Sequence, residues 1–193
     1  MGQDLSRDHP RDQPRELPMT SYALLGLLTF GEPLTGYELK QRADRTLRYY
    51  WVSPAMSQVY SELERLHEHG LVRRHGEDRA TSYSLTRAGS EALTRWMRDT
   101  PVGFPVLKHP VALRLLLGAL VDPESVTAML RDHLVALEHE RADLEKVRVS
   151  LQGADTTGQP FRYPALVADW GLSYFDHERT IIEDLLRKID EGT

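Results

Sequence analysis

The chain of 193 residues contains no cysteine, which excludes disulfide bonds, thiolate nucleophiles and cysteine-ligated zinc. It also lacks a long apolar run, since the longest, LLLGALV at residues 115–121, is far too short to cross a bilayer. The first 18 residues are polar and have no apolar core of the kind that a signal peptide needs. These absences predict a cytoplasmic protein without a membrane partner.

Positive charge is also lacking in the chain as a whole, since 29 Asp and Glu outnumber 24 Lys and Arg and give a net charge of −5. The charge is uneven, with 11 basic and nine acidic residues over 20–98 but 10 basic and 16 acidic residues over 99–193. This balance excludes a wholly basic nucleic-acid coat protein, yet it allows a DNA-binding protein with a local basic face. A near-neutral first part and an acidic second part indicate two separate roles.

Prolines mark the boundaries between the parts of the chain. Three prolines and Gly103 fall within residues 101–110, a density that interrupts helices. The first 18 residues combine three prolines with alternating charges and little apolar surface, which is typical of a disordered arm. We therefore expect an arm at 1–19, a first domain at 20–100 and a second domain at 106–193.

Helical spacing followed by strand-like alternation characterises the first domain. The predicted elements are helices over 21–30, 36–47, 54–69 and 87–99 and strands over 71–75 and 81–86. Thr35 and Ser53 are the candidate N-caps of the second and third helices. Three helices, a hairpin with arginines around its tip and a closing helix form a winged helix-turn-helix.

A winged helix-turn-helix can place its third helix in the major groove, where short polar side chains reach base edges and phosphates. Its hairpin can lay an arginine against the neighbouring backbone or minor groove. Among the polar residues of the third helix, Gln58 alone has the length and the groups to pair bidentately with an adenine edge. The candidate DNA-binding residues are Tyr37, Lys40, Ser53, Ser57, Gln58, Tyr60, Ser61, Arg65, Arg73, Arg74 and Arg79.

Four segments of the first domain resemble the PadR family of bacterial transcriptional regulators. They are, in chain order, YALLGLL at 22–28, TGYELK at 35–40, WVSPAMSQVYSELERLHEHGLV at 51–72 and YSLTRAGSEAL at 83–93. The chain beyond residue 105 resembles the extended helical C-terminal domain of the family's larger members. The resemblance implies a dimeric repressor that a small molecule releases from DNA.

The second domain is predicted to hold a short apolar helix over 106–121 and two long helices, over 124–152 and about 164–190. Leucines recur every seven residues in the first long helix, at Leu130, Leu137, Leu144 and Leu151. This imperfect seam fits pairing between subunits and packing within one subunit equally well. The second long helix carries an apolar stripe, formed by Val167, Trp170, Tyr174, Ile181, Leu185 and Ile189. A hairpin of two such helices cannot bury both faces alone, so we expect a homodimer, whose two-fold symmetry matches a palindromic operator.

Aromatic side chains are the candidate effector site, because the family that this chain resembles binds aromatic or cationic compounds between its two parts. The residues are Trp96, Trp170 and Phe175, which would hold such a ligand by stacking and cation–π contacts. Packing of these rings in an interdomain core is the alternative.

No constellation of catalytic residues stands out in the sequence. The histidine spacings are poor for one metal site, so solvent-facing histidines, no metal and no cofactor are expected.

The fold class predicted from the sequence is mainly α, an N-terminal winged helix-turn-helix with a small β-hairpin wing plus a helical C-terminal dimerisation domain. The predicted function is a sequence-specific, dimeric DNA-binding repressor released by a small-molecule effector. A winged-helix module for protein–protein contacts without DNA binding is the alternative, and a small helical enzyme is the third hypothesis. The arginine wing and the polar third helix favour DNA binding, and the missing catalytic residues count against an enzyme.

Overall fold

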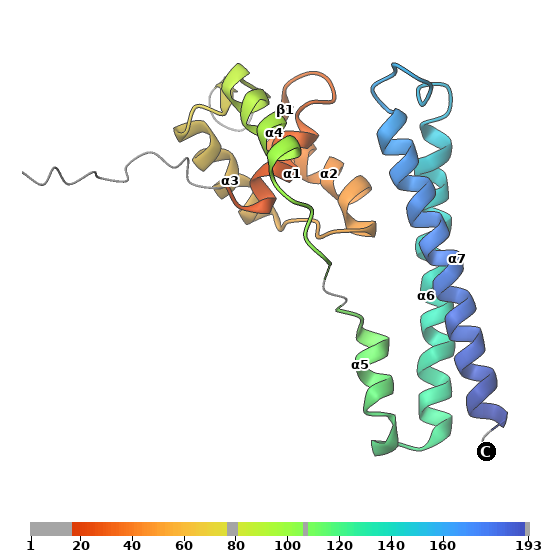
Figure 1. Ribbon diagram of the computed structural model, residues 1–193. Helices are drawn as coiled ribbons and strands as arrows, with labels where there is room; N and C mark the ends of the chain where they lie inside the picture. Colours follow the sequence, from red (N-terminus) through yellow and green to blue (C-terminus); the bar gives the residue numbers. More distant parts are fainter. Residues whose placement is uncertain (1–16, 77–80, 106–107, 192–193) are drawn as a thin grey trace, which may run out of the picture. The chain divides into compact units, whose positions relative to one another are not determined.

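The computed structural model describes residues 17–76, 81–105 and 108–191 (Figure 1). These residues form two compact units, and the chain passes from one unit to the other after Lys40, Ser53 and Thr100, so that residues 41–53 join the C-terminal part. Most of the predicted arm, residues 1–16, lies outside the described residues, and its last residue, Met19, begins the first helix. Within the described residues, no helix is both long and apolar enough to cross a bilayer.

The first unit is a small helical domain with a three-stranded antiparallel sheet in the order β1-β3-β2. Its elements are α1 (Met19–Leu27), β1 (Leu34–Thr35), the first half of α2 (Gly36–Thr46), α3 (Met56–Glu68), β2 (Val72–His75), β3 (Ser82–Leu85) and α4 (Arg87–Asp99). The predicted helices and hairpin are present. Sequence reasoning missed β1, because a strand of two residues is too short to show a period.

Leucines from α1, α2 and α3 meet in the core of this unit. The fully buried ones are Leu24, Leu25, Leu39, Leu63 and Leu66.

The start of α2 is a capping box, as Thr35 predicts: the Thr35 N–H donates to Glu38 Oε2 at 2.8 Å, and the Glu38 N–H donates to Thr35 Oγ1 at 3.2 Å. The N-cap predicted for α3 is wrong. That position is Ala55, and the Ser53 hydroxyl donates to Asp44 Oδ1 at 2.6 Å instead.

The second unit is built on an antiparallel hairpin of two long helices, α6 (Pro123–Ser150) and α7 (Arg162–Glu191) (Figure 1). Two glycines in the connecting turn, Gly153 and Gly158, have φ of 84° and 85°, a backbone region that favours glycine. The shorter elements of the unit are η1 (Leu47–Tyr49), α5 (Pro110–Leu116) and η3 (Gly118–Leu120). Val111 of α5 packs with Val126, Leu130 and Ile182 of the hairpin.

The leucine seam of α6 packs against α7 of the same chain. Leu130, Leu137 and Leu144 are buried, and their partners on α7 include Phe175 and Ile182. The heptad pattern allowed pairing between subunits or packing within one subunit, and the structure therefore shows packing within one subunit for this seam.

The predicted apolar stripe of α7 lies partly on the surface. Trp170 is 62 % exposed and Ile181 is 41 % exposed, whereas the buried residues of the helix are Ala165, Ala168, Gly171, Phe175, Glu178 and Ile182. Small residues let α7 approach α6 closely, so the buried face is centred on them rather than on the largest apolar side chains. Trp170, Tyr174 and Ile181 of the predicted stripe are left exposed, whereas Leu185 and Ile189 pack against the buried cluster around Leu130.

Residues 41–53 belong to the second unit because Arg48 and Tyr49 contact the hairpin. The Arg48 guanidinium lies 3.1 Å from Asp143 Oδ2 and 3.5 Å from Glu140 Oε2, both on α6. The Tyr49 ring meets Phe175 edge to face, with centroids 6.5 Å apart. This short segment thus adds both charge pairing and aromatic packing to the surface of α6 and α7.

Candidate nucleic-acid interface

The outer face of α3 carries small polar side chains and one tyrosine. Ser57, Gln58, Tyr60 and Ser61 are exposed, whereas the opposite face of the helix is buried in the core of the unit. Serine, glutamine and tyrosine side chains both donate and accept hydrogen bonds, so this face suits contacts to phosphates and base edges. A helix with one such face and one buried face is the element that a winged helix presents to the major groove.

Gln58 already has a structural role in the free protein. Its Oε1 accepts the backbone N–H of Ala55 at 3.0 Å, which satisfies an amide at the start of α3. Ala55 has no side-chain acceptor, so only this half of a capping box exists. To pair bidentately with an adenine, Gln58 must exchange its bond to Ala55 for one to the base.

Tyr60 covers the first residue of α2. A Cβ atom at Gly36 would lie 2.6 Å from Tyr60 Cε1, so the ring approaches the backbone more closely than any other residue there would allow. Tyr60 is still 49 % exposed, and Tyr37, next to Gly36, is 57 % exposed. Lys40, the remaining candidate on α2, is half-buried. The start of α2 and the outer face of α3 therefore form one continuous surface of the first unit, rich in tyrosine hydroxyls.

Two arginines project from β2 of the wing. Arg73 pairs in register with Ser84, and Arg74 with Tyr83, and both arginines are exposed. Because side chains alternate along a strand, the two guanidinium groups leave opposite faces of the hairpin. Burial raises the pKa of the Tyr83 hydroxyl, which stays neutral beside them. Arg79 lies outside the described residues.

Arg65 does not extend freely from α3 as the prediction required. Its Nη2 lies 2.5 Å from Glu62 Oε2 and also contacts the Ser21 hydroxyl of α1. The Ser21 hydroxyl in turn donates to Glu62 Oε2 at 2.6 Å, and the Arg65 side chain is 31 % exposed. Arg65 thus joins α3 to α1, and the Ser53 hydroxyl is similarly engaged by Asp44.

The three aromatic residues predicted to hold an effector have different surroundings. Trp96 stacks on Tyr22 within the first unit, with centroids 4.7 Å apart and planes 12° from parallel. Trp170 is exposed on α7. Phe175 is 8 % exposed and packs in the hairpin core.

The expectation of solvent-facing histidines is also wrong at two positions. His109 and His133 both lie within hydrogen-bond distance of the buried Glu178 in the second unit. Histidine spacing along one helix could not show this, because the three residues come from different elements. The available signal was His133 itself, a polar residue four positions before Leu137 of the leucine seam.

These observations define a winged helix-turn-helix protein with a polar recognition face, an arginine-bearing wing and a C-terminal helical hairpin. Residues 24–95 match the transcriptional regulator PadR-like family, and residues 107–190 match the virulence activator alpha C-terminal family. Residues 24–95 are thus a PadR-like domain, and the chain is a transcriptional regulator with a DNA-binding winged-helix fold.

Solved structures share this fold over nearly the whole chain. Bacillus subtilis PadR in complex with operator DNA aligns with a TM-score of 0.76 at 22 % identity, over 90 % of this chain and 99 % of that one. The same protein in complex with p-coumaric acid gives 0.73 at 24 % identity, over 88 % and 98 %. The Vibrio cholerae virulence activator AphA gives 0.70 at 21 % identity, over 90 % and 99 %. No curated protein sequence matches significantly.

Proposed function

We propose that this regulator is a homodimeric repressor that acts in the cytoplasm, reads a palindromic operator with α3 and is released by a small molecule. The observation that carries the DNA-reading part is the set of exposed polar residues on α3, in the same unit as the exposed wing arginines. The proposed contact residues are Tyr37, Lys40, Ser57, Gln58, Tyr60, Ser61, Arg73, Arg74 and Arg79. In this scheme α3 reads bases, and the wing binds backbone or minor groove.

The homodimer is proposed from the exposed stripe of α7. Tyr163, Leu166, Trp170, Tyr174 and Ile181 recur at helical spacing and are between 41 % and 71 % exposed. An apolar stripe of this kind on a helix indicates an interaction surface. Pairing α7 with its copy covers the stripe by two-fold symmetry, and the same symmetry presents two copies of α3 to the two half-sites of an operator.

The effector is proposed to be a small aromatic molecule. A relative of the same fold is known in complex with p-coumaric acid, a planar aromatic acid. Trp96 is the residue that we propose to contact such a ligand by ring stacking, whereas Trp170 is assigned to the dimer surface. Ligand binding is expected to lower the affinity for the operator, because a repressor is released only by an effector that prefers the DNA-free state.

Footprinting on the DNA upstream of the protein's own coding sequence tests the proposal. We expect protection of two half-sites about one helical turn, roughly 34 Å, apart. Affinity should fall steeply as salt rises, because bound cations displace phosphate counterions. A protein that binds this DNA no better than random DNA, with no response to salt, would instead be a winged-helix module for protein contacts.

A further inference from the structure

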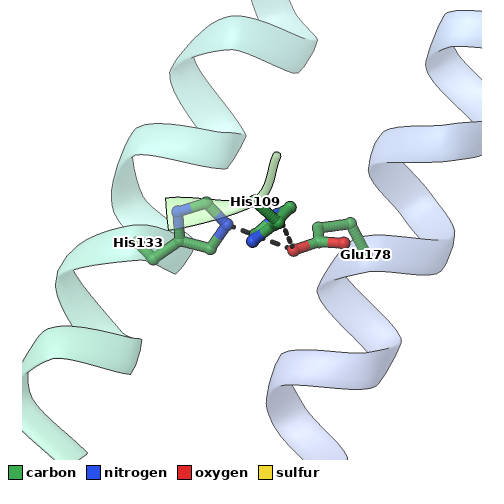
Figure 2. A group of neighbouring side chains, drawn as sticks. All are labelled: His109, His133 and Glu178. Carbon is green, nitrogen blue, oxygen red and sulfur yellow. Dashed lines mark hydrogen bonds and ion pairs between the residues drawn. The ribbon is translucent and has the colours of Figure 1, made fainter. Parts of the chain in front are cut away.

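Three side chains from three parts of the second unit converge on one point (Figure 2). His109 precedes α5, His133 lies on α6 and Glu178 lies on α7. The Nε2 atoms of His109 and His133 lie 2.9 Å and 3.3 Å from the same atom, Glu178 Oε1. The side chains of the three residues are 16 %, 24 % and 10 % exposed, respectively. DNA binding by the first unit gives this cluster no role.

The buried carboxylate of Glu178 needs a compensating positive charge. Among the described residues, its ion-pair partners are the two histidines, and no lysine or arginine pairs with it. One imidazolium is enough to compensate one carboxylate, and the second imidazole can then only donate a neutral hydrogen bond to the same oxygen. A divalent cation compensates the charge and uses both imidazoles as ligands.

We propose that His109, His133 and Glu178 bind a zinc ion, with a fourth position open to water. Two histidines and one glutamate are an established donor set for zinc. Zinc bonds of about 2.0–2.2 Å in tetrahedral geometry place ligand atoms roughly 3.3 Å apart. The three ligand atoms here all lie within 4.8 Å of one another, and two of the pairs lie at 2.9 Å and 3.3 Å. Small movements of the side chains therefore admit the ion.

Zinc binding changes the protonation pattern of His109. Its Nδ1 accepts the backbone N–H of Ala112 at 3.3 Å, so in the metal-free protein a neutral His109 carries its proton on Nε2 and donates it to Glu178. When Nε2 binds zinc, the ring proton moves to Nδ1 and the bond to Ala112 is lost. The hydrogen bonds of His109 with Ala112 and with Glu178 are thereby exchanged for a metal bond, and the ion ties the start of α5 to both long helices.

The test is a zinc titration of the full-length protein without a histidine tag, after treatment with a chelator. We expect one zinc per chain, measured by competition with a chromophoric chelator, and a rise in Tm when zinc is added. His133→Gln and Glu178→Gln should each weaken binding by more than about 100-fold, since even the loss of a hydrogen bond to a ligand costs 10- to 100-fold. The amide oxygen that Glu178→Gln introduces would still accept hydrogen bonds from both histidines, which favours a folded variant.

Matched controls come from exposed residues on the same helices. His139→Gln on α6 and Glu183→Gln on α7 should bind zinc like the wild type. Cobalt(II) in place of zinc should give the wild-type protein the strong visible absorption of tetrahedral coordination. This measurement does not depend on whether the variants fold. The proposal is overturned if a folded His133→Gln or Glu178→Gln variant binds zinc as tightly as the wild type. A cobalt spectrum that remains that of the aquo ion also overturns it, and the cluster is then an ion pair between Glu178 and the histidines.

Discussion

Gly171 of α7 faces Leu144 of α6 so closely that a Cβ atom at residue 171 would lie 2.7 Å from Leu144 Cδ2. Leu144 is 1 % exposed, so its methyl group has little room in which to move away. The contact lies in the half of the hairpin next to the connecting turn, and it turns the buried face of α7 toward small residues. The large side chains of Trp170, Tyr174 and Ile181 are left exposed as a consequence.

A larger residue at position 171 should separate the two helices. Gly171→Val is expected to lower the free energy of unfolding by about 1–3 kcal/mol, the usual cost of overpacking, despite the better helix propensity of valine. Ser173→Val, at an exposed position of the same helix, should change stability by no more than about 0.5 kcal/mol. Denaturant unfolding measures both variants. Combining Gly171→Val with Leu144→Ala should cost less than the sum of the two single changes, and strict additivity would contradict the contact.

Base reading by α3 is tested at Gln58. Gln58→Ala should weaken operator binding by about 1–3 kcal/mol and random-DNA binding much less, because the lost contact is to a base edge. The same change removes the acceptor for the Ala55 N–H, so a loss of stability of about 1 kcal/mol is also expected. Titrations against operator and random duplexes are therefore compared at a temperature where both proteins are folded. An equal loss on both duplexes assigns Gln58 to a phosphate instead.

Arg74 of the wing should bind phosphate rather than a base. Arg74→Ala is expected to weaken operator and random DNA by similar factors and to reduce the slope of log K against log salt by about 0.9. The control is Arg187→Ala on α7. It also removes one positive charge, but Arg187 is paired with Asp184 in the C-terminal unit, so the salt slope should not change. Titrations at several salt concentrations distinguish the two variants. A salt slope unchanged by Arg74→Ala would show that this side chain neutralises no phosphate.

The exposed stripe of α7 should hold the dimer together. Trp170→Glu places a charge on the proposed interface and is expected to shift the protein toward monomer in sedimentation equilibrium, with weaker operator binding as a result. Thr180→Glu adds the same charge on an exposed part of α7 beside the stripe and should leave the dimer intact. A Trp170→Glu variant that sediments like the wild type would place the interface elsewhere.

Acid should weaken one of the ion pairs that join α6 to α7. Arg141 Nε donates to Asp176 Oδ1 at 2.7 Å, and this bond holds the pKa of Asp176 below its usual range. The stabilisation is therefore fully present above the unfolded pKa of about 3.9 and is lost as pH falls through the lower folded value. Because the pair is partly exposed, we expect Arg141→Met to cost about 0.2–1 kcal/mol at pH 7.

The pH dependence of that deficit tests whether Arg141 acts through its charge on Asp176 and on Glu145, to which its Nη1 also donates at 2.7 Å. The stability difference between wild type and Arg141→Met should shrink below about pH 4. Arg131→Met, at an exposed position of the same helix, should show no such dependence. A deficit that stays constant down to about pH 2 would show that Arg141 acts through the packing of its methylene groups rather than through its charge.

Local patterns in the sequence were enough to predict the winged helix-turn-helix. The spacing of the leucines, the Thr35 cap and the alternation of apolar and polar residues in the wing each involve only a few neighbouring residues. The structure has the capping bond and the strand pairing that these patterns predict. The same local signals predicted the two long helices, because their apolar residues repeat over many turns. What they could not show was β1, whose pairing with β3 joins residues far apart in the chain.

The partner of each side chain was a matter of tertiary packing. The heptad of α6 was compatible with a copy of itself or with α7, and close approach at Gly171 selects α7. Arg65 looked exposed by its helical position, yet Ser21 and Glu62 engage it. His109, His133 and Glu178 are distant in sequence, and no spacing within one helix could bring them together. Periodicity reports which face of a helix is apolar, whereas contacts between helices depend on side-chain volume and on approach distance, which the folded chain alone sets.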